Sequence, residues 1–483
     1  MSLKQQTISG ITWSFIDNSF TQVITFVVGI ILARLLTPAE FGLIGMITIF
    51  IAVAQSFVDS GFSQALIRKK DCSDKDYNTV FYFNIGVSII FYLFLFLSAG
   101  LISDFFNELK LLNLIRVLGL GVVINAFGLV QLTQLTKNIE IKVQTKISVI
   151  ANTSSGLIAI FMAYNGLGVW SLVWRTIINN FLRNLLLWYY SKWRPGLLFS
   201  IASFKSLFSF GSKLLVSGLL NTIFENIYFF IIGKYFSAQQ LGFYTRADTF
   251  ARLPSSNING IVQRVSYPVL AKLQDDPVQL KSGLKKLIQI TMFITFVLMF
   301  LMAAVAKPLI LTLIGIKWLQ TIPYLQLLCF ALVLYPLHSL NLNLLNVMGR
   351  SDLFLKLEII KKIAIIPVIF IGIFYGIEAL IIGIIIHSFF AYFINTYFTG
   401  KLIEYSTLEQ IKDIFPSFII ASIVGTTIFI IGHFIKLEQI FSLIIQSFIG
   451  VVFVILLSEL FKLEPYLEIK QIIKNKFIDK YKK

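Results

Sequence analysis

Charged side chains inside apolar segments are the residues of this sequence that could do chemistry. Arg246, Asp248 and Arg252 lie close together in "FYTRADTFARLPSS" (243–256), and Glu225 lies in the preceding apolar segment. The whole chain is 57% hydrophobic and only 13% charged. An ionised side chain at the centre of a bilayer costs at least ~2.5–3.5 kcal/mol, so we expect these groups to face protein or water. Arginine presents a planar fork of donors that stays charged, which suits a phosphate group.

Polar residues form continuous faces on four predicted membrane spans, the first, second, seventh and eighth. At 100° per residue, the members of each set fall on one side of their helix. The sets are Asp17, Asn18, Thr21, Gln22 and Thr25; Gln55, Ser56, Asp59, Ser60 and Ser63; Ser217, Asn221, Thr222, Glu225 and Asn226; and Thr245, Asp248, Thr249, Arg252, Ser255, Ser256, Asn259 and Gln263. We expect these faces to line one water-filled cavity. The alternative is that they only hydrogen-bond helices to one another, as Ser, Thr and Asn do in membranes.

The excess of cations within the spans predicts that the cavity accepts an anion. The predicted substrate contacts are Arg252, Arg246, Asp248, Asn221, Gln22, Asn18, Gln55 and Asn259. Asp248 precedes Arg252 by four residues, the favourable order for a helical ion pair. Two positions stay open for Arg246: it reaches the cavity if the helix rotates near Pro254, or it extends to the outer interface. The candidate carriers of a coupling ion are Glu225, Asp17 and Asp59, because buried carboxylates can titrate near neutral pH.

Long apolar stretches must position these residues. Segments of about 20 residues, enough to cross a ~30 Å hydrocarbon layer, recur along the whole chain. They predict fourteen spans: 10–35, 41–67, 77–101, 112–136, 145–164, 168–190, 207–236, 241–270, 284–306, 321–345, 357–375, 377–398, 413–433 and 439–461. The fold class is therefore all-α and polytopic, since a membrane barrel would show alternating segments of about ten residues. The first span lacks a basic leader and a cleavage site, which predicts a retained helix and no signal peptide.

An internal repeat organises the spans. At an offset of 200 residues, "ARLLTPAEFGL" (33–43) aligns with "GKYFSAQQLGF" (233–243), and polar positions of the flanking spans correspond. An offset that covers an even number of spans predicts a parallel repeat, with two pseudo-symmetric six-helix lobes and two additional C-terminal helices. The predicted boundaries are 1–205 and 206–400 for the lobes and 401–483 for the last helices and a basic tail. Transporters built from such repeats bind substrate between the halves.

Most Lys and Arg lie in loops on the side of the N-terminus and in the basic C-terminal tail, which predicts that both termini are cytoplasmic. Those loops and anionic lipid headgroups account for the net charge of +17, so nucleic-acid binding is not expected. Cys72 and Cys329 indicate no disulfide framework. His338, His387 and His433 stand apart from one another in the sequence and predict packed or interfacial residues and no metal site. No cofactor is expected.

Two activities are disfavoured by the absence of their motifs. No G-x-x-x-x-G-K-[ST] sequence and no segment long enough for a nucleotide-binding domain are present, which predicts a secondary or facilitated carrier. No nucleophile–base arrangement is evident, so the chain is not expected to be an enzyme. A membrane glycosyltransferase with a sparse acidic site remains an alternative.

Several stretches resemble a known family. They are "GITWSFIDN", "ILARLLTPAEFGLIGM", "FVDSGFSQALIRKKD", "NGLGVWSLV", "LGFYTRADTFARLP", "VSYPVLAKLQDD", "IGIKWLQTIPYLQLL" and "NVMGRSD", all within about residues 8–355. The sequence resembles the Wzx-type polysaccharide flippases of the multidrug/oligosaccharidyl-lipid/polysaccharide exporter superfamily, including lipopolysaccharide and teichuronic-acid biosynthesis exporters. That resemblance implies export of an undecaprenyl-pyrophosphate-linked oligosaccharide from the cytoplasmic to the outer leaflet of the bacterial inner membrane. A polysaccharide polymerase and a chain-length regulator are the protein partners that it suggests, beside membrane lipids.

The resemblance also leaves differences and alternatives. Related flippases of the peptidoglycan precursor use cavity arginines on the first, second and eighth helices, whereas the first two helices here offer Asp17 and Asp59. Only the eighth span keeps the cationic character. A cation-coupled exporter of small amphipathic drugs, from the same superfamily, and a scaffold for a polysaccharide assembly complex are the alternatives.

Overall fold

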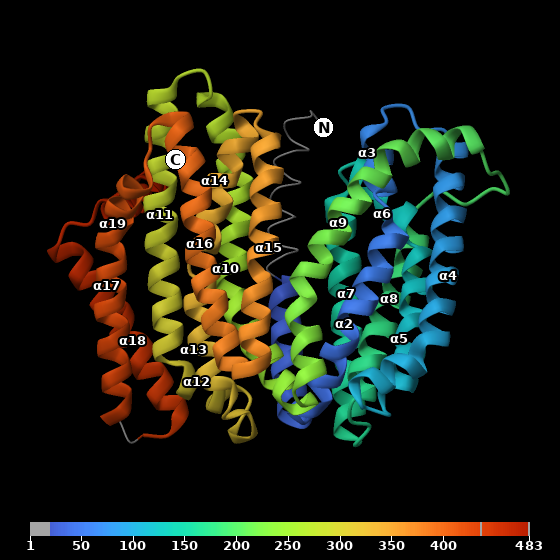
Figure 1. Cartoon of the computed structure of the whole chain (residues 1–483), viewed down its shortest axis with the longest axis horizontal. Coiled ribbons are helices and arrows are strands. Elements are labelled where there is room, and N and C mark those ends of the chain that lie inside the picture. The colour runs from blue at the N-terminus through green and yellow to red at the C-terminus, as the bar shows by residue number, and fades with distance from the viewer. Residues whose placement is uncertain (1–19, 435–436, 482–483) are drawn as a thin grey trace. The chain divides into compact units, whose positions relative to one another are not determined.

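A computed structural model describes residues 20–434 and 437–481 of the chain (Figure 1). The described residues form helices and their connections, with no strand among them. The chain divides into two compact units, Met1–Gly242 (unit 1) and Phe243–Lys483 (unit 2). The all-α fold class predicted from the apolar stretches is confirmed.

Unit 1 begins, in its described part, with a helix at Phe20–Leu35. The helices that follow it are α2 (Pro38–Asp59), α3 (Phe62–Arg68), α4 (Asp74–Phe106), α5 (Leu111–Ala126), α6 (Leu129–Lys137), α7 (Ile141–Tyr164), α8 (Trp170–Tyr190) and α9 (Ile201–Tyr235). α10 (Ala238–Leu273) starts in unit 1 and continues in unit 2.

Unit 2 continues with ten further elements. They are α11 (Pro277–Ala304), α12 (Ala306–Leu313), the 3-10 turn η1 (Ile316–Trp318), α13 (Thr321–Leu332), α14 (Tyr335–Val347), α15 (Ser351–Tyr375), α16 (Ile377–Ile403), α17 (Thr407–Phe434), α18 (Gln439–Leu460) and α19 (Glu464–Tyr481).

The predicted count of fourteen spans is not confirmed. By length and composition, nine segments of the described chain could cross a membrane, or ten if α5 and α6, which meet at a 43° bend, form one span. α10 is not among them, because Arg246, Asp248, Arg252 and its other polar residues lower its hydropathy. The polar side chains that suggest function therefore also lower the hydropathy of α10 below the value that identifies a membrane span.

The predicted span 41–67 lies within one candidate span of the structure, Pro38–Arg68, in which a turn separates α2 from α3. Ser60 and Gly61 both adopt left-handed backbone conformations, with φ of 47° and 68°. Glycine takes up this conformation without steric cost. A β-carbon at Gly61 would also lie 2.6 Å from the carbonyl oxygen of Gly211 on α9. The break therefore lets α9 approach the backbone of the turn.

The two helix starts aligned by the internal repeat are capped in the same way. The Thr37 N–H donates to Glu40 Oε2 (2.7 Å) before α2, and the Ser237 N–H donates to Gln240 Oε1 (3.4 Å) before α10. The Gln240 N–H returns a bond to Ser237 Oγ (3.2 Å). Reciprocal bonds of this kind satisfy donors that a helix start leaves open. The positions that the predicted repeat aligns thus have equivalent local structure.

Glycines of the repeat also face each other across these helix starts. A β-carbon at Gly42 would lie 1.7 Å from the carbonyl oxygen of Ala238, and one at Gly242 would lie 1.8 Å from that of Pro38. All four residues belong to unit 1. Only glycine permits so close an approach of two backbones. The reciprocal contact is what an approximate two-fold relation between the repeated segments would produce.

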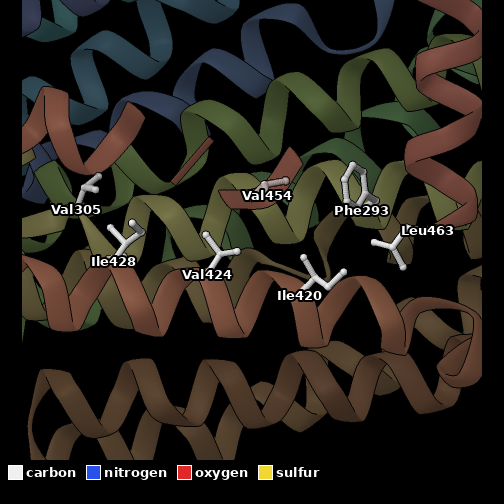
Figure 2. Packing of buried hydrophobic residues seen from close by; sticks show 8 residues of the cluster. Phe293, Val305, Ile420, Val424, Ile428, Val454 and Leu463 are labelled. Carbon is white, nitrogen blue, oxygen red and sulfur yellow. The ribbon is translucent and has the colours of Figure 1, made fainter. Parts of the chain in front are cut away.

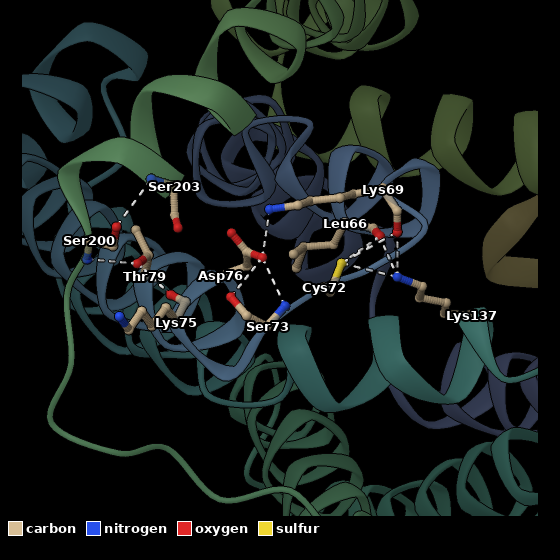
Figure 3. Close-up of polar contacts among 10 residues, drawn as sticks. All are labelled: Leu66, Lys69, Cys72, Ser73, Lys75, Asp76, Thr79, Lys137, Ser200 and Ser203. Atoms are coloured by element: carbon tan, nitrogen blue, oxygen red, sulfur yellow. Dashed lines mark hydrogen bonds and ion pairs between the residues drawn. The ribbon is translucent and has the colours of Figure 1, made fainter.

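A polar clamp holds the connection between α3 and α4 (Figure 3). Lys137 Nζ, at the end of α6, donates to the carbonyl oxygens of Leu66 (3.1 Å) and Lys69 (2.6 Å) and lies 3.0 Å from Cys72 Sγ. Lys69 Nζ pairs with Asp76 Oδ2 at 2.7 Å. A lysine is favourable here because the last carbonyl groups of a helix lack partners within the helix.

Apolar packing in unit 2 joins α11, α17, α18 and the start of α19. Phe293, Val424, Ile428 and Val454 are buried in one cluster, which also includes Ala304, Val305, Ile420 and Leu463 (Figure 2). The last two membrane-type helices therefore pack onto α11 and form part of unit 2.

Candidate functional site

The charged pair predicted on α10 is present. Arg252 Nε lies 2.8 Å from Oδ1 and 2.7 Å from Oδ2 of Asp248, four residues earlier. The Asp248 side chain is 8% exposed and that of Arg252 is 45% exposed. The pair lowers the cost of placing either charge in a membrane-type helix, because each charge compensates the other. The predicted ion pair is confirmed.

The geometry of that pair leaves part of Arg252 open. Both contacts with Asp248 use Nε, and the terminal nitrogens Nη1 and Nη2 make no hydrogen bond to the described residues. A guanidinium group carries five N–H donors, four of them on the terminal nitrogens. The side chain is thus held at Nε, and the donors of its terminal nitrogens suit a phosphate or carboxylate.

The remaining surface of α10 separates into a packed face and a polar exposed face. Tyr244, Ala247, Ala251 and Ser255 are buried. Thr249, Arg252, Ser256 and Gln263 are exposed, at spacings of three, four and seven that keep them on one side of the helix. Among the predicted contacts, Arg246 and Asn259 are half-buried. Whether Arg246 reaches a cavity stays a prediction.

In unit 1, part of the predicted polar face joins two helices. Ser56 Oγ on α2 lies 3.0 Å from Thr222 Oγ1 on α9. Ser63 Oγ donates to Asp59 Oδ1 at 2.6 Å. For Ser56 and Thr222, the alternative that polar residues hydrogen-bond helices together therefore describes what is observed.

The other predicted contacts of unit 1 are placed as follows. Gln22 and Gln55 are half-buried, whereas Asn221 and Glu225 are exposed on α9. Of the coupling-ion candidates, Asp59 is half-buried, and Asp17 lies outside the described residues, as does the predicted contact Asn18. Roles in binding or coupling stay predictions for all of these residues.

A buried polar network in unit 2 was not predicted from the sequence. Asn341 on α14 and Gln410 on α17 exchange amide hydrogen bonds of 3.3 and 3.2 Å. Thr399 Oγ1 on α16 donates to Asn341 Oδ1 at 2.8 Å. Single polar residues on three separate helices give no stripe, so the helical periodicity that marks α10 carries no signal here.

The histidines of unit 2 include two that bond within it. His338 Nε2 lies 3.2 Å from Ser388 Oγ, and His387 Nε2 lies 2.9 Å from the carbonyl oxygen of Lys361. Over residues 20–434 and 437–481, no group of three or more His, Cys, Asp or Glu side chains is placed to hold a metal ion.

A family model described as "Polysaccharide biosynthesis protein" matches residues 31–323. Over 402 residues the chain is 30% identical to the lipopolysaccharide biosynthesis protein WzxC of Escherichia coli (strain K12), which covers 82% of this chain and 80% of that relative. The chain belongs to the polysaccharide biosynthesis protein family.

Two further similarities support this assignment and the fold. The teichuronic acid biosynthesis protein TuaB of Bacillus subtilis (strain 168) is 28% identical over 357 residues, covering 73% of both chains. The structure of the lipid II flippase MurJ in an inward closed conformation matches with a TM-score of 0.75 and 15% identity, covering 93% of this chain and 98% of that one. This family member therefore has the fold of a multi-pass membrane transporter.

Proposed function

We propose that this protein flips a polyprenyl-pyrophosphate-linked oligosaccharide from the cytoplasmic to the outer leaflet for surface polysaccharide biosynthesis. Membership of the polysaccharide biosynthesis protein family supports the glycan part of the cargo. The observation that supports the anionic part is Arg252, whose Nε is held by Asp248 while its terminal nitrogens have no hydrogen bond to any residue that the structure describes. A membrane-type helix that only packed against its neighbours would have no need of this charge.

The residues of α10 suggest how the cargo is held. The terminal nitrogens of Arg252 would donate to the pyrophosphate, because a planar guanidinium fork bonds two phosphate oxygens at once. Thr249 and Ser256 lie on the same exposed face and would bond sugar hydroxyl groups. The polyprenyl tail would stay in the bilayer, so that it would not have to leave its apolar surroundings. The predicted contacts Arg246 and Asn259 lie on α10 as well, and Asn221, Gln22, Gln55 and Asn18 stay predicted contacts with the cargo.

Alternating access would carry the bound headgroup across. Moving one uncompensated negative charge outward through an inside-negative potential is favourable by ~2.3 kcal/mol per 100 mV. An arginine that moved with the cargo would cancel part of that gain. A coupling ion would then supply the remainder, with Glu225, Asp59 and Asp17 as its candidate carriers.

The remaining parts of the proposal concern the setting of the protein. It would lie in the bacterial inner membrane with both termini in the cytoplasm, since most Lys and Arg lie in loops on that side. It would act as a carrier without catalysing a reaction, and it would deliver its cargo to a polysaccharide polymerase with a chain-length regulator. Reporter fusions at the two termini test the orientation.

A flipping assay tests the central claim. The full chain is reconstituted into liposomes with a fluorescent polyprenyl-pyrophosphate oligosaccharide, and the labelled lipid that an external quencher reaches is followed in time. Arg252→Gln is expected to slow flipping at least tenfold, the loss typical of one well-placed charged contact. Arg264→Gln, which removes the same charge from the exposed surface of the same helix, is the matched control.

The outcomes separate the competing functions. Equal flipping by Arg252→Gln and wild type would overturn the role given to Arg252. Absence of flipping by the wild type, combined with uptake of small cationic drugs into the same liposomes, would favour a drug exporter. A wild type that moves neither cargo would favour the scaffold.

A further inference from the structure

Two cavities adjoin at one end of unit 2, where α12 and the start of α18 lie near the end of α17 (Figure 1). The first, called here the headgroup cavity, has a volume of about 360 Å³. Its polar lining consists of Lys307, His433, Gln439, Ser442 and Gln446, together with the backbone at Gly432. These residues belong to none of the polar faces assigned to the transport cavity.

The second cavity, called here the chain cavity, has a volume of about 280 Å³ and is largely apolar. Phe300, Phe330 and Gly425 line it. Ala304 and Phe429 line both cavities, so that the polar and the apolar space share a wall. A ligand that fills both must be amphipathic.

Gln446 gives the headgroup cavity an unmet hydrogen-bonding capacity. Its side chain is buried, with 1% of the residue exposed, and its Nε2 donates to Ser442 Oγ at 2.6 Å. Its Oε1 has no partner in the part of the chain that the structure describes. A buried acceptor without a partner is costly, which makes a ligand with a hydroxyl or amine donor favourable at this point.

Gly432 keeps that amide accessible. A β-carbon at this position would lie 2.9 Å from both Nε2 and Oε1 of Gln446. Any larger residue on α17 would therefore press on the amide group from the side of the cavity. The glycine and the buried glutamine together form a shaped polar recess.

The charges of the headgroup cavity favour an anion. Lys307 and His433 are the titratable residues of its lining, and no carboxylate among the described residues lines it. Lys307 lies in the first turn of α12, exposed at the end of unit 2. A lysine ammonium group is a common partner of phosphate.

The order of the two cavities along the helices matches that of a lipid in a leaflet. On α17 the headgroup cavity is lined by His433, and the chain cavity by Gly425, about 12 Å further from the helix end at 1.5 Å per residue. Phe429, Phe434 and Phe441 around them are 55, 75 and 55% exposed, as expected of a lipid-facing surface. In a bilayer crossed by α17, the polar recess would lie nearer the interface and the apolar one deeper.

We propose that the paired cavities bind a glycerophospholipid whose headgroup combines an anionic phosphate with hydroxyl groups. The phosphate would lie against Lys307 and His433, and a headgroup hydroxyl would donate to Gln446 Oε1. One acyl chain would pass Phe429 into the chain cavity. The site is separate from the proposed transport site, so neither proposal depends on the other.

Retention of lipid by the purified full chain tests the site. The detergent-solubilised protein is mixed with diacyl phosphatidylglycerol, and bound lipid is counted by native mass spectrometry. Lys307→Gln and Gln446→Leu are each expected to lower retention about tenfold, the equivalent of one lost charged or buried polar contact. Gly432→Ala should do the same by closing the recess. Lys317→Gln, which neutralises a lysine on η1 that lines neither cavity, is the matched control.

Competition identifies the ligand. Glycerophosphoglycerol, the same headgroup without acyl chains, and inorganic phosphate should each fail to displace the lipid at a hundredfold excess. Displacement by either would overturn the lipid assignment in favour of a free anion. Equal retention of phosphatidylethanolamine would overturn the assignment of a hydroxylated anionic headgroup.

A folding defect is kept apart from a binding defect. Each variant is first required to give a single gel-filtration peak and a melting temperature near that of wild type. If Gln446→Leu fails this requirement, Lys307→Gln and Gly432→Ala still decide the question. Wild-type retention by both would refute the site.

Discussion

Removing one partner of the Asp248–Arg252 pair should have effects that differ with the partner removed. Arg252→Gln leaves a carboxylate whose side chain is 8% exposed, whereas Asp248→Asn leaves a guanidinium whose side chain is 45% exposed. An uncompensated buried charge costs about 3 kcal/mol or more, and loss of an exposed pair costs about 1 kcal/mol or less. We expect Arg252→Gln to lower the free energy of unfolding by about 3 kcal/mol and Asp248→Asn by about 1 kcal/mol.

The double variant gives the sharpest test of this reasoning. With both charges removed, nothing buried is left uncompensated, so the loss should return to about 1 kcal/mol, and the two single effects should not add. Unfolding by sodium dodecyl sulfate in mixed micelles can be followed through the fluorescence of the six Trp residues. Ser256→Ala on the exposed face of α10 is the control. A double variant as unstable as Arg252→Gln, or Asp248→Asn more damaging than Arg252→Gln, would refute the account.

Three further predictions concern stability. Gly42→Ala and Gly242→Ala should each lower the free energy of unfolding by about 1–3 kcal/mol, and with it the melting temperature, because their β-carbons would lie 1.7 and 1.8 Å from carbonyl oxygens. Gly218→Ala on α9, with nothing within 4 Å, should raise it slightly. Asn341→Leu and Gln410→Leu should each cost about 1–3 kcal/mol in detergent unfolding by stranding the other amide, and the double variant should cost less than their sum. Bonds from the backbone N–H groups of Gln279 and Val278 hold the pKa of Asp276 below its usual range. This cap therefore stabilises α11 fully when the pH is above the unfolded-state pKa of an aspartate. The contribution is lost as the pH falls through the folded-state pKa. Asp276→Asn should make the melting temperature depend less on pH between pH 5 and 3. A pH dependence equal to that of wild type would contradict this role.

The sequence was most informative where structure is decided locally. The pair on α10 was predictable because an acid four residues before a base on one helix needs no tertiary knowledge. The alignment at an offset of 200 residues sets Thr37 opposite Ser237, and each residue caps its helix through bonds formed within four residues of the helix start, although the caps themselves were not predicted. Left-handed Ser60 and Gly61 divide a predicted span, and the Ser-Gly dipeptide was a turn signal that the apolar flanks obscured.

Tertiary contacts were beyond the reach of periodicity. The same kind of polar stripe holds Ser56, bonded to Thr222 on another helix, and Arg252, whose terminal nitrogens bond no residue of the described part of the chain. Helical spacing gives the side of the helix on which a residue lies, but only the packed neighbour shows whether that side is filled. The network around Asn341 is the opposite case, because its members are close in space and each is isolated in the sequence.

The Asp248–Arg252 pair also explains how a membrane helix can retain a cation suited to binding an anion. An unpaired arginine would make insertion of α10 costly, and an arginine fully enclosed by a carboxylate would have no donors left for a cargo. Asp248 contacts Nε, so the pair is electrically compensated at its buried carboxylate, while the terminal nitrogens have no hydrogen bond within residues 20–434 and 437–481. Because the carboxylate already fixes the side chain, binding an anion would cost little additional rotamer freedom. An arginine held in this manner is suited to binding a phosphate reversibly, which is what a carrier that must also release its cargo requires.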